Sequence, residues 1–263
     1  MQDKMQNTAQ VYFVGAGPGA ADLITVRGMK LIEQADVVIY AGSLVNPALL
    51  GYAKEGTEIH NSAHMTLEQV LEVMKDAADA GKTVVRLHTG DPSLYGAVRE
   101  QMDALDDMGI SYESCPGVTA AFGAAASMDI EYTLPGISQS LIFTRMAGRT
   151  DVPEKESIES WAAHRASMAI YLSTGMLEEL SQRLIAGGYE ADTPAAIIYK
   201  ATWPEEEYYY CKVSELAATA AAHGITKTAL VLVGDVLAKS MSGYEKSKLY
   251  DKTFSTEFRA AEE

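Results

Sequence analysis

Short apolar runs alternate with amphipathic helical patterns along most of this chain, and that alternation constrains its fold more than any other feature. Leu67, Val70, Leu71 and Met74 recur at three- and four-residue spacing, which is typical of the buried face of a helix. Strands that alternate with helices form an open, mostly parallel α/β sheet, because parallel neighbours need a crossover between them. In the first half we expect strands over residues 11–14, 36–40, 83–88 and 111–114, and helices over 23–34, 67–80 and 95–108.

A stretch rich in turn-forming residues, 127–138, interrupts this alternation before a second set of elements begins. There we expect strands over 139–145, 168–173, 195–199, 207–212 and 230–233, and helices over 154–164, 176–186 and 214–223. The sequence therefore predicts two α/β lobes, at residues 10–126 and 138–237, followed by a polar tail at 238–263.

The charge and cysteine content exclude several classes of partner and site. The 263 residues carry a formal net charge of −15 and no basic stripe, so neither nucleic acid nor a membrane is an expected partner. Cys115 and Cys211 stand alone, and the histidines lack metal-ligand spacing, so neither a disulfide framework nor a metal site is expected. The polar start and the absence of any apolar run near the ~20 residues that span a bilayer favour a cytoplasmic protein.

A glycine-rich turn, "VGAGPGAADLIT" at residues 14–25, follows the first expected strand. Gly15, Gly17 and Ala20 match the G-x-G-x-x-A fingerprint of dinucleotide sites. However, Pro18 has no backbone N–H, and Asp36 stands at the start of the next strand instead of at its end, where an acid would bind a ribose. An NAD-dependent oxidoreductase is therefore kept only as an alternative.

Two further stretches have the composition of ligand loops. Thr89, Gly90 and Asp91 in "VVRLHTGDPSLYG" follow a strand where α/β sheets bind ligands, although Asp91 and Pro92 can also simply begin the next helix. In "CPGVTAAFGAAAS", residues 115–127, a turn and a capping Thr119 precede small residues, which tight helix packing alone also explains.

These three stretches together resemble the tetrapyrrole methylases, S-adenosylmethionine-dependent enzymes of sirohaem and cobalamin synthesis. The stretches "YAGSLVNPALL", "LIFTRMAGRTDVPEKE" and "IYKATWPEEE" are similar to the branch that methylates ring carbon 11 of precorrin-4 or cobalt-precorrin-4. The resemblance covers about residues 10–237. It implies a two-lobed α/β fold with a mostly parallel first sheet and a mixed second sheet. It also implies a homodimer and S-adenosyl-L-methionine held between the lobes, with S-adenosyl-L-homocysteine as the product.

The resemblance also implies which residues bind each ligand. Cofactor contacts are expected from Pro18, Thr89, Gly90, Asp91, Leu94, Thr119 and Ala120, and from Leu172 and Ala201 in the second lobe. Thr89 stands where uroporphyrinogen methylases carry a glycine. No catalytic residue is expected, because methyl transfer from a sulfonium depends mainly on alignment and exclusion of water.

The implied substrate is a macrocycle with many carboxylates, so a chain of charge −15 needs locally placed cations to bind it. Arg145, Arg149 and Lys200 are the candidates, with Ser43 and Tyr95 at the cleft wall and His88 as a further possibility. Each arginine can instead pair with Glu154 or Glu156. Other open alternatives are a methylase of another ring carbon or of the diphthamide precursor, and a binding module without catalysis.

Overall fold

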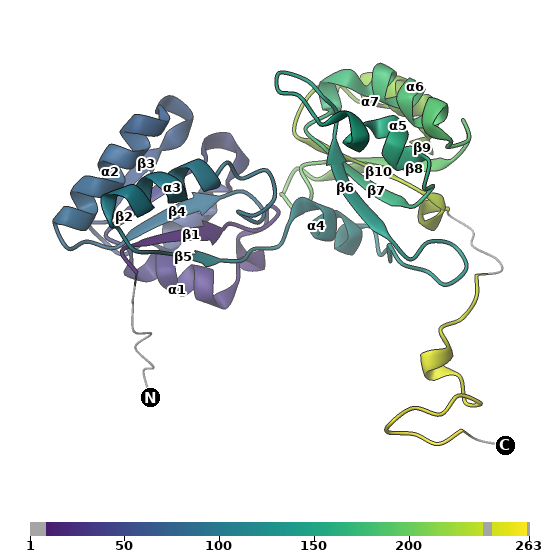
Figure 1. The fold of residues 1–263 in the computed structure, drawn as a ribbon, viewed down its shortest axis with the longest axis horizontal. Coiled ribbons are helices and arrows are strands. Elements are labelled where there is room, and N and C mark those ends of the chain that lie inside the picture. Colours follow the sequence, from purple (N-terminus) through teal and green to yellow (C-terminus); the bar gives the residue numbers. More distant parts are fainter. Residues whose placement is uncertain (1–8, 239–243, 262–263) are drawn as a thin grey trace. The chain divides into compact units, whose positions relative to one another are not determined.

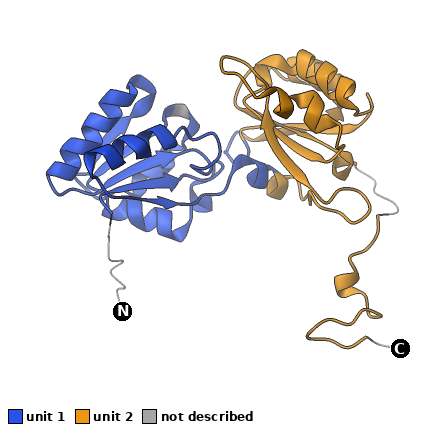
Figure 2. Cartoon of the chain, in the orientation of Figure 1, with its two compact units in different colours: residues 1–124, 201–205 blue, residues 125–200, 206–263 orange. Residues whose placement is uncertain are grey.

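The computed structural model describes residues 9–238 and 244–261, which form two compact units (Figures 1 and 2). Unit 1 comprises Met1–Ala124 with Ala201–Glu205, and unit 2 comprises Ala125–Lys200 with Glu206–Glu263. Each unit contains one five-stranded sheet with helices packed on it. The predicted α/β fold with two lobes is thus confirmed.

The sheet of unit 1 is entirely parallel. Its strand order is β3-β2-β4-β1-β5. The strands are β1 (Val11–Gly15), β2 (Val37–Tyr40), β3 (Glu58–Asn61), β4 (Val84–His88) and β5 (Tyr112–Cys115). Four of them follow the expected apolar runs. The sequence missed β3, a polar edge strand whose residues are exposed or half-buried and give no apolar signal.

Helices cover both faces of this sheet (Figure 1). On one face, α1 (Val26–Gln34) buries Leu31 and Ile32. On the other, α2 (Leu67–Asp79) and α3 (Arg99–Met108) pack around Phe13. Thr66 and Gln69 form a capping box at the start of α2. The prediction that a helix begins at residue 95 is wrong, because Tyr95 and Ala97 adopt left-handed φ angles of 56° and 49°.

The sheet of unit 2 is mixed, as expected. Its order is β6-β7-β10-β8-β9, with β6 and β7 parallel and the remaining neighbours antiparallel. The strands are β6 (Leu141–Arg145), β7 (Ser167–Tyr171), β8 (Pro194–Tyr199), β9 (Glu207–Lys212) and β10 (Ala229–Val233). One face carries α5 (Ile158–Ala162), α6 (Leu177–Gly187) and α7 (Leu216–Ala222), whose apolar side chains enclose the core of the unit.

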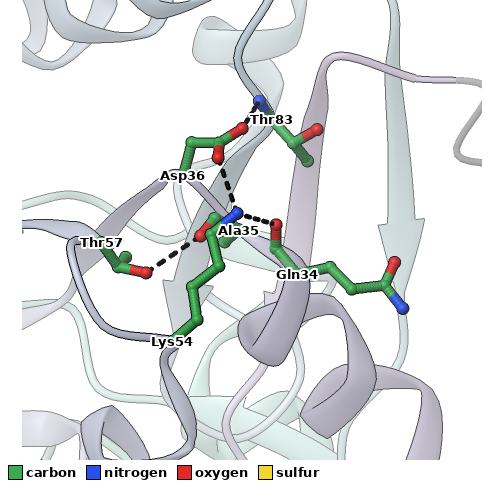
Figure 3. Close-up of polar contacts among 6 residues, drawn as sticks. All are labelled: Gln34, Ala35, Asp36, Lys54, Thr57 and Thr83. Atoms are coloured by element: carbon green, nitrogen blue, oxygen red, sulfur yellow. Dashed lines mark hydrogen bonds and ion pairs between the residues drawn. The ribbon is translucent and has the colours of Figure 1, made fainter.

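Asp36 joins the amino ends of β2 and β4 (Figure 3). One carboxylate oxygen accepts from the Thr83 amide at 2.9 Å, and the other pairs with Lys54 Nζ at 2.7 Å. Lys54 also donates to the carbonyl of Gln34 at 3.0 Å. The two hydrogen bonds that the Asp36 carboxylate accepts, first that from Lys54 and then that from Thr83, lower the pKa of Asp36. Because the strands are parallel, Asp36 lies at the edge of the sheet opposite the glycine-rich turn and cannot bind a ribose there.

Helix α4 (Ala120–Ser127) follows β5. Within residues 9–238 and 244–261, every helix is too short or too polar to cross a lipid bilayer.

Candidate functional site

The segments that follow β1, β4 and β5 meet in direct backbone contact at the carboxyl edge of the unit 1 sheet. Gly17 and Gly90 exchange amide hydrogen bonds of 3.2 and 2.9 Å. A Cβ atom on Gly15 would lie 2.6 Å from the Gly117 Cα, and one on Gly117 would lie 2.1 Å from the Gly90 carbonyl oxygen. These distances leave no space for a side chain, so the close approach of the three segments requires glycine.

Asp91 connects two of these segments. Its carboxylate accepts from the Gly117 amide at 2.8 Å and from the Ser93 amide at 2.8 Å. Burial acts to raise the pKa of Asp91, but hydrogen bonds from Ser93 and Gly117 outweigh it, and the net pKa is lowered. The alternative that Asp91 and Pro92 begin a helix is wrong, since α3 begins at Arg99. Asp91 instead fixes the loop in which Thr89, Gly90 and Leu94 lie.

Pro18 and Thr119 adjoin the same glycines. A Cβ atom on Gly123 of α4 would lie 2.6 Å from Pro18 Cβ, so the proline ring packs directly on this helix. Thr119 is buried, and its carbonyl accepts from the amides of Phe122 and Gly123 in the first turn. A Cβ atom on Gly90 would lie 3.4 Å from Thr119 Cα. The structure therefore gathers Pro18, Gly90, Asp91, Thr119 and, next in the chain, Ala120.

A distant segment of the chain also packs on the glycine-rich turn in unit 1. Ala201 was expected in the second lobe, but residues 201–205 belong to unit 1. The hydroxyl of Thr202 accepts from the Ala20 amide at 3.0 Å. A Cβ atom on Gly19 would lie 2.1 Å from the Trp203 ring and 2.7 Å from the Ala201 carbonyl oxygen. Ala201 consequently lies beside the glycine-rich turn.

The amides of this turn are largely occupied by the protein itself. Ala16 donates to the His88 carbonyl at 2.7 Å, Gly17 donates to Gly90, and Ala20 donates to Thr202. Since Pro18 has no N–H, four of the five positions from 16 to 20 offer no amide to a ligand. A pyrophosphate cradle needs such amides, so the turn is poorly suited to a dinucleotide. A cofactor without phosphates needs none, so the residues present fit S-adenosylmethionine.

Several predicted residues adopt strained backbone conformations. Eight described residues other than glycine have positive φ, and Tyr95, Leu172 and Lys200, at 56°, 53° and 47°, are among them. Leu172 is also 66% exposed, which is unusual for a bulky apolar side chain in a conformation that costs about 1–3 kcal/mol. Strain of this kind concentrates at functional positions.

The residues predicted to bind the substrate differ in their surroundings. Arg145 donates to the carbonyls of Met146, Thr150 and Asp151, so it holds its own loop together instead of pairing with Glu154 or Glu156. Arg149 is exposed on that loop, and Lys200 Nζ lies 5.6 Å above the Tyr199 ring. Ser43 lies in a short turn, Gly42–Leu44, and its side chain is outside the described part of the structure.

Sequence reasoning did not single out Thr202 and Trp203, which pack on the glycine-rich turn, or Arg86 of β4, whose side chain donates to Gln101 of α3 at 3.2 Å. Arg86 did give a signal, because it is a charged residue within the apolar run of β4, at an alternate position shared with the buried Val84. The packing of Thr202 and Trp203 on the glycine-rich turn depends on tertiary structure, which local sequence does not encode.

Comparison with known proteins gives consistent matches. A family model described as tetrapyrrole (corrin/porphyrin) methylases matches residues 10–217. The cobalt-precorrin-4 C(11)-methyltransferase of Methanocaldococcus jannaschii is 50% identical over 255 residues, covering 97% of this chain and 98% of that protein. The precorrin-4 C(11)-methyltransferase of Pseudomonas aeruginosa is 47% identical over 240 residues, covering 91% and 94%.

Solved structures agree. That of a cobalt precorrin-4 methyltransferase matches with a TM-score of 0.85 at 44% identity, covering 87% of this chain and 95% of that one. The uroporphyrin-III C-methyltransferase of Thermus thermophilus, crystallised with S-adenosyl homocysteine, matches with a TM-score of 0.70 at 25% identity, covering 87% and 93%.

Proposed function

The chain belongs to the tetrapyrrole methylase family, and we propose that it methylates ring carbon 11 of precorrin-4 or cobalt-precorrin-4 in corrin-ring synthesis. The observation that carries the proposal is the 50% identity, over 97% of the chain, to a relative that bears this activity in its name. The glycine-rich turn supports it, because its occupied amides suit a cofactor without phosphates.

S-adenosyl-L-methionine supplies a methyl group on a sulfonium, which an electron-rich ring carbon can accept. Pro18, Gly90, Thr119 and Ala201 provide a rigid surface of backbone and small side chains for it in unit 1. Asp91 keeps this surface in shape through its hydrogen bonds to Gly117 and Ser93. Further contacts are assigned to Thr89, Leu94, Ala120 and Leu172, and S-adenosyl-L-homocysteine is the product.

The protein's contribution to the rate is alignment of the donor with the acceptor and exclusion of water. A site built for alignment must be rigid, and three backbone segments in van der Waals contact around Gly15, Gly90 and Gly117 provide that rigidity. For the substrate, Arg149, Lys200, Tyr95 and Ser43 are assigned to contacts with the macrocycle, and Arg145 to shaping the loop that carries Arg149. We further infer that the protein is cytoplasmic and forms a homodimer; sedimentation of the purified chain tests the homodimer.

Two measurements test the proposed function. Calorimetry should detect S-adenosyl-L-homocysteine binding at a stoichiometry of about one per chain, while NAD should not bind. A reconstituted reaction with either precorrin-4 or its cobalt complex should then place the new methyl group on carbon 11 by NMR. If the folded protein does not bind S-adenosyl-L-homocysteine, the proposal is contradicted. A methyl group on another carbon reassigns the chain to a different branch of the family.

A further inference from the structure

Two polar side chains are buried beneath a cavity at the carboxyl end of β4. Arg86 and His88 are 7% and 4% exposed, and they share the sheet face that α2 and α3 cover. The cavity has a volume of about 280 Å³, and both side chains line it together with Gln101 and Tyr95. The proposed function gives Arg86 no role, and His88 entered the sequence analysis only as a further candidate cation, so the burial of the pair needs an explanation.

The positive charge of Arg86 has only neutral partners. Its Nε donates to Gln101 Oε1 at 3.2 Å, and one terminal nitrogen, Nη1, donates to the Ile39 carbonyl at 3.3 Å. Among the described residues no carboxylate forms an ion pair with it. Burial accordingly lowers the pKa of Arg86 to about 10. Buried charges are normally paired, so the guanidinium of Arg86 is suited to bind an anion that enters the cavity.

His88 also lacks a partner. Its Nε2 is buried and makes no hydrogen bond within the described part of the chain. Burial and, secondarily, the charge of Arg86 lower the pKa of His88 to about 3, so the ring is neutral near pH 7. A neutral imidazole has one N–H to donate. Buried polar atoms of this kind are rare and are explained most simply by a ligand or water.

The charge of the cavity favours an anion of limited size. Its lining includes one carboxylate, that of Glu100, which is exposed in the first turn of α3 and therefore screened by water. Arg86 is buried and so is screened much less. A volume of about 280 Å³ accommodates a short carboxylate-bearing arm and not a whole macrocycle.

We propose that this cavity is a carboxylate subsite, in which Arg86 and His88 bind one acetate or propionate side chain of the tetrapyrrole substrate. The inference rests on the proposed function for the identity of the ligand. The role of the subsite is to fix the macrocycle by one peripheral arm, so that a single ring carbon faces the methyl donor.

The first test uses the full chain carrying His88→Phe. Replacing an unpartnered buried polar group by an apolar one is neutral or stabilising, so the variant should melt at the wild-type temperature or above. Loss of a hydrogen bond to a charged ligand should raise the KM for the tetrapyrrole about tenfold. The Kd for S-adenosyl-L-homocysteine should stay the same. His60→Phe, at an imidazole outside the cavity that pairs with Glu58, is the matched control and should leave KM unchanged.

The second test needs no methyl transfer and so separates the subsite from the proposed function. Sodium propionate is titrated into protein with ¹⁵N-labelled histidine, with sodium chloride at equal concentrations for comparison. Propionate should shift the ring signals of His88 in the wild type but not in Arg86→Met, and chloride should shift neither.

The outcomes are distinguishable. The subsite alone is overturned if two results occur together: His88→Phe transfers methyl groups with an unchanged KM, and propionate does not shift the His88 ring signals of the wild type. An equal shift with chloride overturns its assignment to carboxylates. A propionate response without methyl transfer to either precorrin supports the subsite as a carboxylate site and overturns the proposed function.

Discussion

At the scale of single residues, Asp36 and Asp91 show how position decides what a carboxylate does. Both have a lowered pKa, and both accept from backbone amides. Asp91 lies at the carboxyl edge of the sheet, where it shapes the loop of the proposed cofactor site. Asp36 lies at the amino edge, where it joins β2 to β4 (Figure 3). Its contribution is to stability, and that contribution is titratable.

We predict that Asp36→Asn lowers the urea midpoint of unfolding at pH 7. The pKa of Asp36 is depressed in the folded protein, so its ionised form stabilises the fold above the unfolded-state pKa of ~3.9, and this stabilisation is lost as the pH falls through the folded pKa. The difference between variant and wild type should therefore shrink in the acid range. The side chains of Lys54 and Asp36 are 45% and 36% exposed, so water screens their ion pair. The loss of unfolding free energy in the variant should therefore stay below about 1 kcal/mol.

Urea titrations at several pH values measure this difference. Asp22→Asn, at an exposed acid in the same unit, is the control and should give no such pH-dependent gap. A gap for Asp36→Asn that persists undiminished at low pH would mean that the lost interaction is not that of the ionised carboxylate.

Among the structural elements, the glycine-rich turn depends on a segment that is distant in the chain, since Ala20 and Thr202 are 182 residues apart. Thr202 and Trp203 pack on Ala20 and Gly19, and Thr202 holds a φ of 66° to do so. Because Thr202 Oγ1 is the acceptor for the Ala20 amide, the turn takes its shape from contacts that its own sequence does not contain. Its ligand affinity should therefore respond to a change at residue 202.

We predict that Thr202→Val weakens S-adenosyl-L-homocysteine binding roughly threefold or more, because the Ala20 amide loses its acceptor. Thr202→Ser retains the hydroxyl and should bind nearly as well as the wild type. Calorimetry on the two variants measures the difference. Equal affinity of the valine variant and the wild type would show that the hydrogen bond from Ala20 to Thr202 does not shape the turn.

The sequence predicted those elements whose signal is local. Apolar runs marked β1, β2, β4 and β5, and parallel strands place their exits at one edge, so the meeting of the three glycine segments followed from topology. The polar edge strand β3 gave no such signal, and the left-handed Tyr95 and Ala97 delayed α3 at residues that carry no glycine. Two features depend on tertiary packing and were not predicted: residues 201–205 pack in unit 1, and Arg86 and His88 are buried side by side. The lobe boundaries at residues 126 and 138 and the roles of the individual site residues stay predictions.

At the scale of the whole molecule, the net charge of −15 opposes the binding of a substrate with many carboxylates. The two effects act over different distances. Repulsion by the exposed acidic surface is long-range and is screened by salt, with a Debye length of about 10 Å at 0.1 M. Attraction by a buried group such as Arg86, which is 7% exposed, acts at contact and is screened much less.

We therefore predict that kcat/KM for the tetrapyrrole rises as ionic strength increases from about 0.01 M to about 0.15 M, because salt removes the repulsion and leaves the contact attraction. The Kd for S-adenosyl-L-homocysteine, which is a zwitterion without net charge, should change little over the same range and is the internal control. Steady-state rates at constant pH measure the first quantity, and calorimetry measures the second. If kcat/KM falls with salt instead, exposed cations such as Arg149 dominate the encounter, and the substrate is steered by a local basic surface against the field of the whole chain.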